Sequence, residues 1–152
     1  MKKIDSIVAA AQIALAYFPF QPLVTAYDSV SPAKGFLHNV VETPLSTSIA
    51  TSILMYDINY AYMMIQKHMP NFDHISSPRQ AALMLTHVII GPRNFQAIPL
   101  LNALSIRNQW DDVGTAILVS QYANEFPEIF TIISEMLEKD KFIYTNQEHK
   151  RP

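Results

Sequence analysis

The sequence of 152 residues is long enough to bury a hydrophobic core in one domain without metals or cross-links. Its formal net charge of −2 provides no broad cationic field for nucleic acid or anionic lipid, and the lack of cysteine excludes disulfides, thiolate zinc sites and cysteine nucleophiles. Because only 3 residues are glycine while 49% are hydrophobic, we predict an all-α domain with few tight turns and some apolar surface that meets a partner.

The first 18 residues predict a buried helix. Lys2 and Lys3 precede an Ala-rich run that favours helix, and Pro19 and Pro22 end it. The same pattern suits a targeting or signal-anchor segment, but Asp5 and a polar residue inside the run favour the buried helix. The run falls short of the roughly 20 apolar residues that a membrane span needs, so we predict no stable membrane span.

Residues 19–44 contain the least regular part of the chain. Prolines recur there with few glycines, and no alternating strand pattern is sustained. We expect a loop-rich, largely sheet-less N-terminal lobe with one short extended segment around Leu23 to Tyr27.

From Leu45 onward, helical spacing of apolar residues dominates. Ser46 or Thr47 can cap a long helix that continues to Pro70, and Ser77-Pro78 is a typical helix start. The next helix should end at Gly91-Pro92, since glycine and a following proline terminate helices.

Three shorter helices are expected after that break. Residues 94–104 predict one that is interrupted near Pro99, Asp111 and Asp112 suit the first turn of the next, and Phe126-Pro127 opens the last. We therefore predict a single domain over residues 1–152, with a first lobe over 1–44, a helical lobe over 45–143 and a polar tail over 144–152.

The order and spacing of these segments resemble the helical lobe of the phage-type lysozymes, the small muramidases of bacterial viruses. The similarity covers about two thirds of the chain. In that family a long connecting helix precedes a buried helix, a phenylalanine, a leucine-rich stretch and a helix opened by an aromatic residue. The matching residues here are Gln80, Ala82, Leu83, Gly91, Phe95, Leu100, Leu101, Leu104, Trp110, Asp111, Ser120 and Pro127.

The catalytic part of the family pattern is incomplete. The segment from Leu23 to Ser29 resembles the stretch that follows the family's catalytic glutamate, and seven residues before Tyr27 that glutamate is replaced by Phe20. Glycoside hydrolysis needs one protonated carboxyl group as acid, with a second carboxylate or a positioned water on the other face. The acidic residues before Glu42 are Asp5 and Asp28, so the resemblance implies a lysozyme-like domain without its acid.

Two carboxylates remain as candidate catalytic residues. If the chain is active, Glu42 and Asp28 are the pair that could serve a divergent muramidase, but a position before a helix start for Glu42 and a turn cap for Asp28 explain them better. Tyr27 and His38 could bind a ligand in the former cleft, and the resemblance places His38 near a family histidine. The five histidines lack metal-ligand spacing, and His87 fits a hydrogen-bonded core position. We predict neither a metal site nor a cofactor.

Tyrosine and methionine are concentrated in the long helix. Tyr56, Tyr60, Tyr62, Met63, Met64 and Met69 could line a binding surface, or one side of the helix could belong to the core. If Tyr56 and Tyr60 face away from the core, an interface is favoured. Both are therefore candidate binding residues.

The resemblance to the phage-type lysozymes, together with the missing acid, implies a function. We expect a catalytically inactive, lysozyme-like structural or interaction protein of a bacteriophage particle, present in the virion or in the host cytoplasm before assembly. The alternatives are a divergent muramidase and a glycan- or protein-binding module that uses the former cleft. The expected partners are other virion proteins or a second copy of the chain, with peptidoglycan as a further candidate and no nucleic acid.

Overall fold

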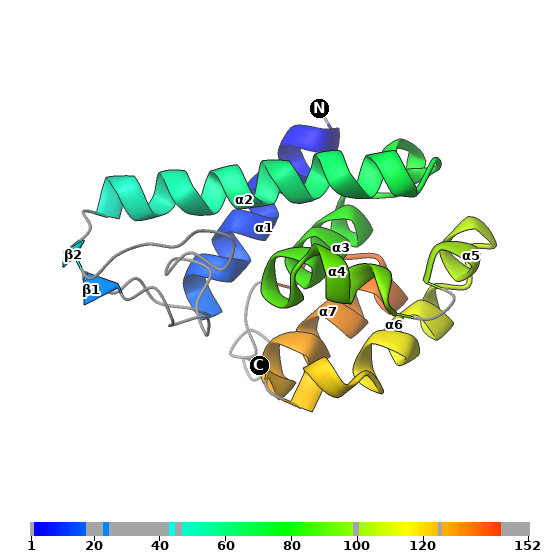
Figure 1. Ribbon diagram of the computed structural model, residues 1–152. Helices are drawn as coiled ribbons and strands as arrows, with labels where there is room; N and C mark the ends of the chain where they lie inside the picture. The colour runs from blue at the N-terminus through cyan, green and yellow to red at the C-terminus, as the bar shows by residue number, and fades with distance from the viewer. Residues whose placement is uncertain are drawn as a thin grey trace, which may run out of the picture.

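The computed structural model describes residues 2–17, 23–24, 43–44, 47–98, 101–124 and 126–143, most of which are helical (Figure 1). The helices are α1 (Lys2–Tyr17), α2 (Thr47–His68), α3 (Ser77–Ile90), α4 (Pro92–Gln96), α5 (Leu101–Ile106), α6 (Trp110–Leu118) and α7 (Pro127–Lys139), with 3-10 turns η2 (Phe72–His74) and η3 (Gln121–Asn124). The all-α prediction is confirmed.

Helix α3 lies at the centre of the core. All ten residues from Gln80 to Ile89 are buried, because this segment is apolar on nearly every side and is surrounded by α1, α2, α4 and α7. Two of the three polar side chains in this run donate hydrogen bonds to nearby carbonyl groups: Gln80 to that of Phe72 at 2.8 Å, and Thr86 to that of Ala82 at 2.9 Å. Helix α3 is therefore the structural centre of the described residues.

Two helices cover α3 from the N-terminal half of the chain. Helix α1 packs against both α3 and α2 through small and branched side chains such as Ala10, Ile13 and Ala14, so it belongs to the core. Helix α2 has 22 residues, about 33 Å at 1.5 Å per residue. Its buried residues recur with helical spacing at Leu54, Ile58, Ala61 and Ile65.

A short antiparallel pair of strands connects the regions around α1 and α2. Strand β1 (Leu23–Val24) pairs with β2 (Thr43–Pro44), with Leu23 opposite Pro44 and Val24 opposite Thr43. Strand β1 lies in the extended segment expected around Leu23 to Tyr27. This ladder is the sole sheet within the described residues, and residues 25–42 lie outside them.

The helix boundaries follow the expected signals with one correction. Helix α3 is preceded by Ser76 rather than Ser77 as its N-cap, and the Ser76 hydroxyl hydrogen-bonds to Asp140 instead of capping an amide. The helix ends at Gly91, whose φ of 85° and ψ of 160° lie in a region essentially restricted to glycine. The expected interruption near Pro99 separates α4 from α5.

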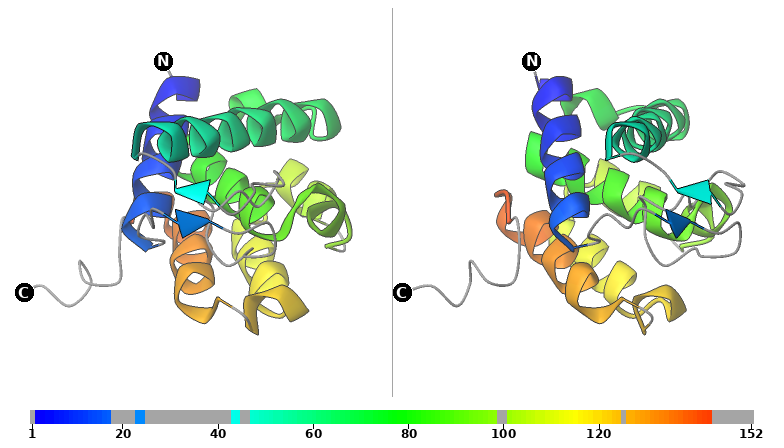
Figure 2. Two further views of the ribbon diagram at one scale, coloured as in Figure 1. Left: turned by 60° about the vertical axis from the view of Figure 1, so that its left-hand side comes forward. Right: turned by 90° about the vertical axis from the view of Figure 1, so that its left-hand side faces the viewer.

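Helices α6 and α7 form the opposite side of the molecule from α2. The two views in Figure 2 show α2 across the upper side, with α6 and α7 along the lower side. Helix α7 buries Ile129, Phe130, Ile133 and Leu137 against α3 and α6. The core is therefore one continuous helical assembly over the described residues.

Candidate functional site

The candidate catalytic residues fall in the N-terminal region. Phe20, Tyr27, Asp28, His38 and Glu42 lie outside the described residues, so the predicted carboxylate pair has no measured geometry. The candidate binding residues Tyr56 and Tyr60 lie on α2, where their surroundings are described.

A row of four residues on α2, which we call the α2 stripe, consists of Tyr56, Tyr60, Met63 and Lys67. Tyr56, Met63 and Lys67 are exposed, whereas Tyr60 is half-buried and its ring centroid lies 6.4 Å from that of His87. The four residues follow at spacings of four, three and four, so they share one helical face. Tyr56 is 60% exposed and Met63 is 55% exposed, and the rings of Tyr56 and Tyr60 stack with centroids 6.4 Å apart at 11°. The exposed tyrosine and methionine side chains are of the types favoured at protein interfaces.

The remaining aromatic and sulfur-containing residues of this region belong to the core. Tyr62 and Met69 are buried, and Met64 is half-buried. One side of α2 therefore belongs to the core, which agrees with one of the two predictions for this helix. The α2 stripe lies on the other side.

Tyr62 links three segments through polar contacts. Its hydroxyl donates to Asp73 at 2.6 Å, Gln66 donates to the other carboxylate oxygen at 2.7 Å, and the Lys3 ammonium lies 4.8 Å from the Tyr62 ring centroid. Burial and the neighbouring Asp73 carboxylate raise the pKa of Tyr62 to about 12, and the hydrogen bonds from Tyr62 and Gln66 lower the pKa of Asp73. These contacts fasten α1 and η2 to α2, so their role is structural.

Two titratable side chains are buried next to the core. Asp57 on α2 is fully buried, and this burial raises its pKa from 3.8 to about 7. His87 on α3 is buried between the rings of Phe95, at 5.2 Å, and Tyr60, at 6.4 Å. Burial first, and then the charge of His68, lower the pKa of His87 to about 4, so its imidazole is neutral at pH 7.

The structure agrees with the predicted core position of His87. The hydrogen bonding expected for its imidazole is not made by Nδ1. That atom has no hydrogen-bond partner among the described residues. The aromatic rings on either side hold the imidazole by packing instead.

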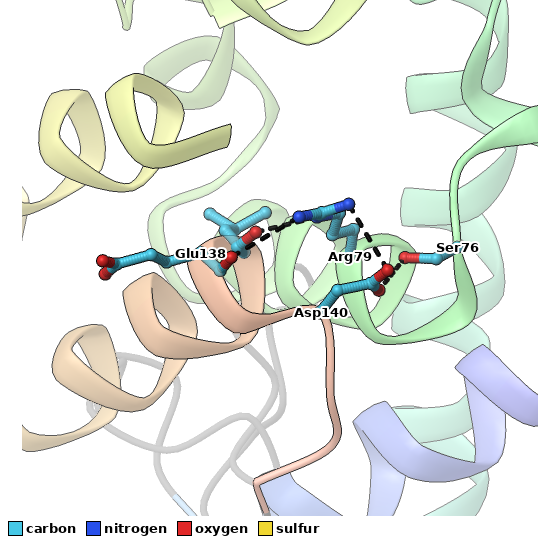
Figure 3. Close-up of polar contacts among 5 residues, drawn as sticks. Ser76, Arg79, Glu138 and Asp140 are labelled. Atoms are coloured by element: carbon cyan, nitrogen blue, oxygen red, sulfur yellow. Dashed lines mark hydrogen bonds and ion pairs between the residues drawn. The ribbon is translucent and has the colours of Figure 1, made fainter. Parts of the chain in front are cut away.

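Arg79 joins the start of α3 to the end of α7 (Figure 3). Its Nε donates to the carbonyl of Leu137 at 2.7 Å, a terminal nitrogen lies 3.4 Å from the Asp140 carboxylate, and its guanidinium lies 5.0 Å from the Trp110 ring centroid. Arginine suits this position because its planar group can donate in several directions while it stacks on an aromatic ring. The sequence pattern carried no signal for this role of Arg79.

A surface groove of about 450 Å³ lies beside this arginine. It is lined by polar and apolar side chains from η2, α3, the end of α5 and the start of α6, among them His74, Arg79, Asn108 and Trp110. Asn108 adopts a φ of 58°, a conformation that asparagine tolerates better than most residues. The Arg79 guanidinium is already held by acceptors of the fold. It is therefore not available as a cation for chemistry in the groove.

No group of three or more His, Asp or Glu side chains within the described residues is arranged to hold a metal ion. Among the helices of the described segments, none is sufficiently long and apolar for a membrane crossing.

Comparisons with protein-family models, with curated proteins and with solved structures found no match to this chain. Its function is therefore inferred from residue chemistry and geometry.

Proposed function

We propose that this chain is a lysozyme-like domain without muramidase activity that serves as a structural or interaction protein of a bacteriophage particle. The observation that carries the interaction role is the α2 stripe, where Tyr56 and Met63 are more than half exposed on the longest helix of the described residues. Large apolar side chains grouped on one exposed face indicate a surface that meets a partner.

The order of the helices supports the lysozyme-like part of the proposal. A first helix packs onto the helical assembly, a short strand pair follows, a long helix leads into the centre, and α3 is buried as the resemblance requires. Trp110 opens α6, in keeping with the family's helix that is opened by an aromatic residue, and Pro127, which matches a later proline of the family pattern, is the first residue of α7. A shared fold does not imply a shared activity, so the chemistry must be judged at the site itself.

The loss of activity is supported by the sequence before Glu42. Phe20 cannot donate a proton to a leaving oxygen, and Asp28 could supply at most the second carboxylate. The absence of Lys and Arg from Asn108 to Glu138 also weakens attraction to an anionic wall polymer. The surface of this lobe is thus better suited to another protein.

Zymography on peptidoglycan tests the loss of activity. We expect no clearing from the purified chain, whereas an active phage lysozyme clears the gel under the same conditions. Clearing that disappears in Glu42→Gln but persists in an exposed-site control, Glu138→Gln, would overturn the proposal in favour of the divergent muramidase.

The location of the chain tests the structural role. We expect an epitope-tagged chain to co-sediment with particles purified from the phage-infected host. Its recovery only in the soluble fraction of the lysate would contradict a role in the virion.

Titration with chitooligosaccharides followed by NMR distinguishes the glycan-binding alternative. We expect no saturable shifts of resonances from residues 20–42. Saturable shifts there would replace the structural role by glycan recognition in the former cleft.

A further inference from the structure

The side chains of the α2 stripe change in chemical character along the helix. Stacked Tyr56 and Tyr60 come first, Met63 follows, and Lys67 lies at the C-terminal end. Asp57 is the one acidic residue between Thr47 and His68, and it is fully buried. The exposed face of α2 is therefore apolar at its middle and cationic at its C-terminal end, with no exposed carboxylate.

A second exposed surface on α6 has the opposite charge, and we call it the α6 ridge. It consists of residues at helical spacing that are all exposed, namely Asp111, Asp112, Thr115, Leu118 and Val119. Leu118 is 41% exposed and Val119 is 76% exposed. No Lys, Arg or His occurs from Asn108 to Glu138, so the ridge begins with two carboxylates and ends in apolar side chains. Arg107 precedes this span, and Arg79 lines the same surface hollow as Asp111 and Asp112, where it is held by the Leu137 carbonyl and Asp140.

The two surfaces match in register when the helices run antiparallel. Seven residues separate Lys67 from Tyr60 on α2, and seven separate Asp111 from Leu118 on α6, which is about 10.5 Å in each case. When the Lys67 ammonium lies opposite Asp111 and Asp112, the tyrosines of the α2 stripe therefore lie opposite the apolar end of the α6 ridge. The same orientation brings the negative C-terminal end of α2 to the positive N-terminal end of α6.

We propose that the α2 stripe of one copy of this chain docks on the α6 ridge of a second copy. The two surfaces lie on opposite sides of the molecule, with α3 and α4 between them, so one copy can engage two neighbours (Figures 1 and 2). Such a contact joins two different surfaces, and its repetition forms a ring or a filament rather than a closed pair. This inference rests on the proposed interaction role and names the partner of the α2 stripe.

Charge reversal on each surface tests the pairing. Lys67→Glu places a carboxylate opposite the acidic end of the ridge. The double substitution Asp111→Lys with Asp112→Lys places cations opposite Lys67. We expect the parent chain to self-associate in sedimentation velocity, and either variant alone to associate roughly tenfold more weakly or worse because like charges meet. An equimolar mixture of the two variants should recover association, since each then offers the surface that the other needs.

Matched variants separate this pairing from other outcomes. Asp5→Lys changes an exposed charge on α1, which belongs to neither surface, and should leave association unchanged, and Val119→Asp should abolish it. Circular dichroism establishes that each variant folds.

Three results would overturn the pairing. They are a parent chain that stays monomeric, a mixture that fails to recover association, and association that survives the Asp111 and Asp112 reversals as an α2-to-α2 dimer would. None of the three restores muramidase activity, so each leaves the proposed loss of activity standing.

Discussion

Gly114 on α6 faces Ser134 on α7 so closely that a Cβ atom on the glycine would lie 2.8 Å from the Ser134 Oγ and 3.3 Å from its carbonyl oxygen. Both residues are buried, and this approach brings the two helices together beneath the α6 ridge. A glycine in the middle of a helix is otherwise unfavourable, so its presence reflects the contact rather than helix propensity.

Gly114→Ala is therefore expected to destabilise the domain by about 1–3 kcal/mol, because the added methyl group forces α6 and α7 apart. Urea unfolding followed by circular dichroism measures the change in the free energy of unfolding. Ser134→Ala removes the nearer of the two clashing oxygens and should recover part of the loss in the double variant. A stabilised Gly114→Ala variant, as expected for a helix without this contact, would contradict the close approach.

Arg79→Lys is expected to cost about 1–3 kcal/mol although it preserves the charge. The ammonium cannot reproduce the bond to the Leu137 carbonyl while it also lies against Trp110. Thermal unfolding measures the loss.

Asp140→Asn is the matched control for Arg79. It removes the charge from the 3.4 Å ion pair but keeps a residue that tolerates the φ of 55° at this position. Its effect should stay within about 1 kcal/mol, the range of partly exposed ion pairs. A larger loss in Asp140→Asn than in Arg79→Lys would mean that the ion pair, rather than the planar guanidinium, holds α7 to α3.

Asp57 should make the domain less stable as the pH rises. Its folded pKa of about 7 lies above the ordinary value of 3.8, so the folded state binds the extra proton between these values. The stabilising contribution is complete below about pH 4 and is lost by about pH 7, with an upper limit of about 4 kcal/mol. Asp57→Asn should abolish this slope and stabilise the domain at about pH 8, as measured by urea unfolding across the range.

His87 should produce the opposite slope in nearly the same range of pH. Its folded pKa of about 4 lies below the ordinary value of 6.5, so the unfolded state binds the extra proton and stability is lost as the pH falls from about 6.5 to 4. The upper limit is about 3 kcal/mol. The two slopes should largely cancel in the parent chain, and His87→Leu should reveal the falling slope of Asp57.

A parent-like profile in His87→Leu would show that the imidazole is not held neutral by burial.

The sequence by itself determined the helices and most of their ends. Local signals suffice for these, because apolar spacing, Pro78, the Gly91-Pro92 break and the carboxylates of Asp111 and Asp112 act within one or two turns of the chain. The same local rules placed the cap of α3 one residue late, since the Ser76 hydroxyl is drawn to Asp140, 64 residues away in the sequence.

The tertiary structure alone decided which side chains of a helix are buried and which surfaces face one another. Asp57 and Lys67 both belong to α2, yet one is fully buried and the other exposed, because α1 and α3 cover the side of α2 that bears Asp57. The sequence alone shows that Lys and Arg are absent from Asn108 to Glu138. The proposed pairing of the α6 ridge with Lys67 required the fold, because charge complementarity depends on the distances between segments far apart in the chain.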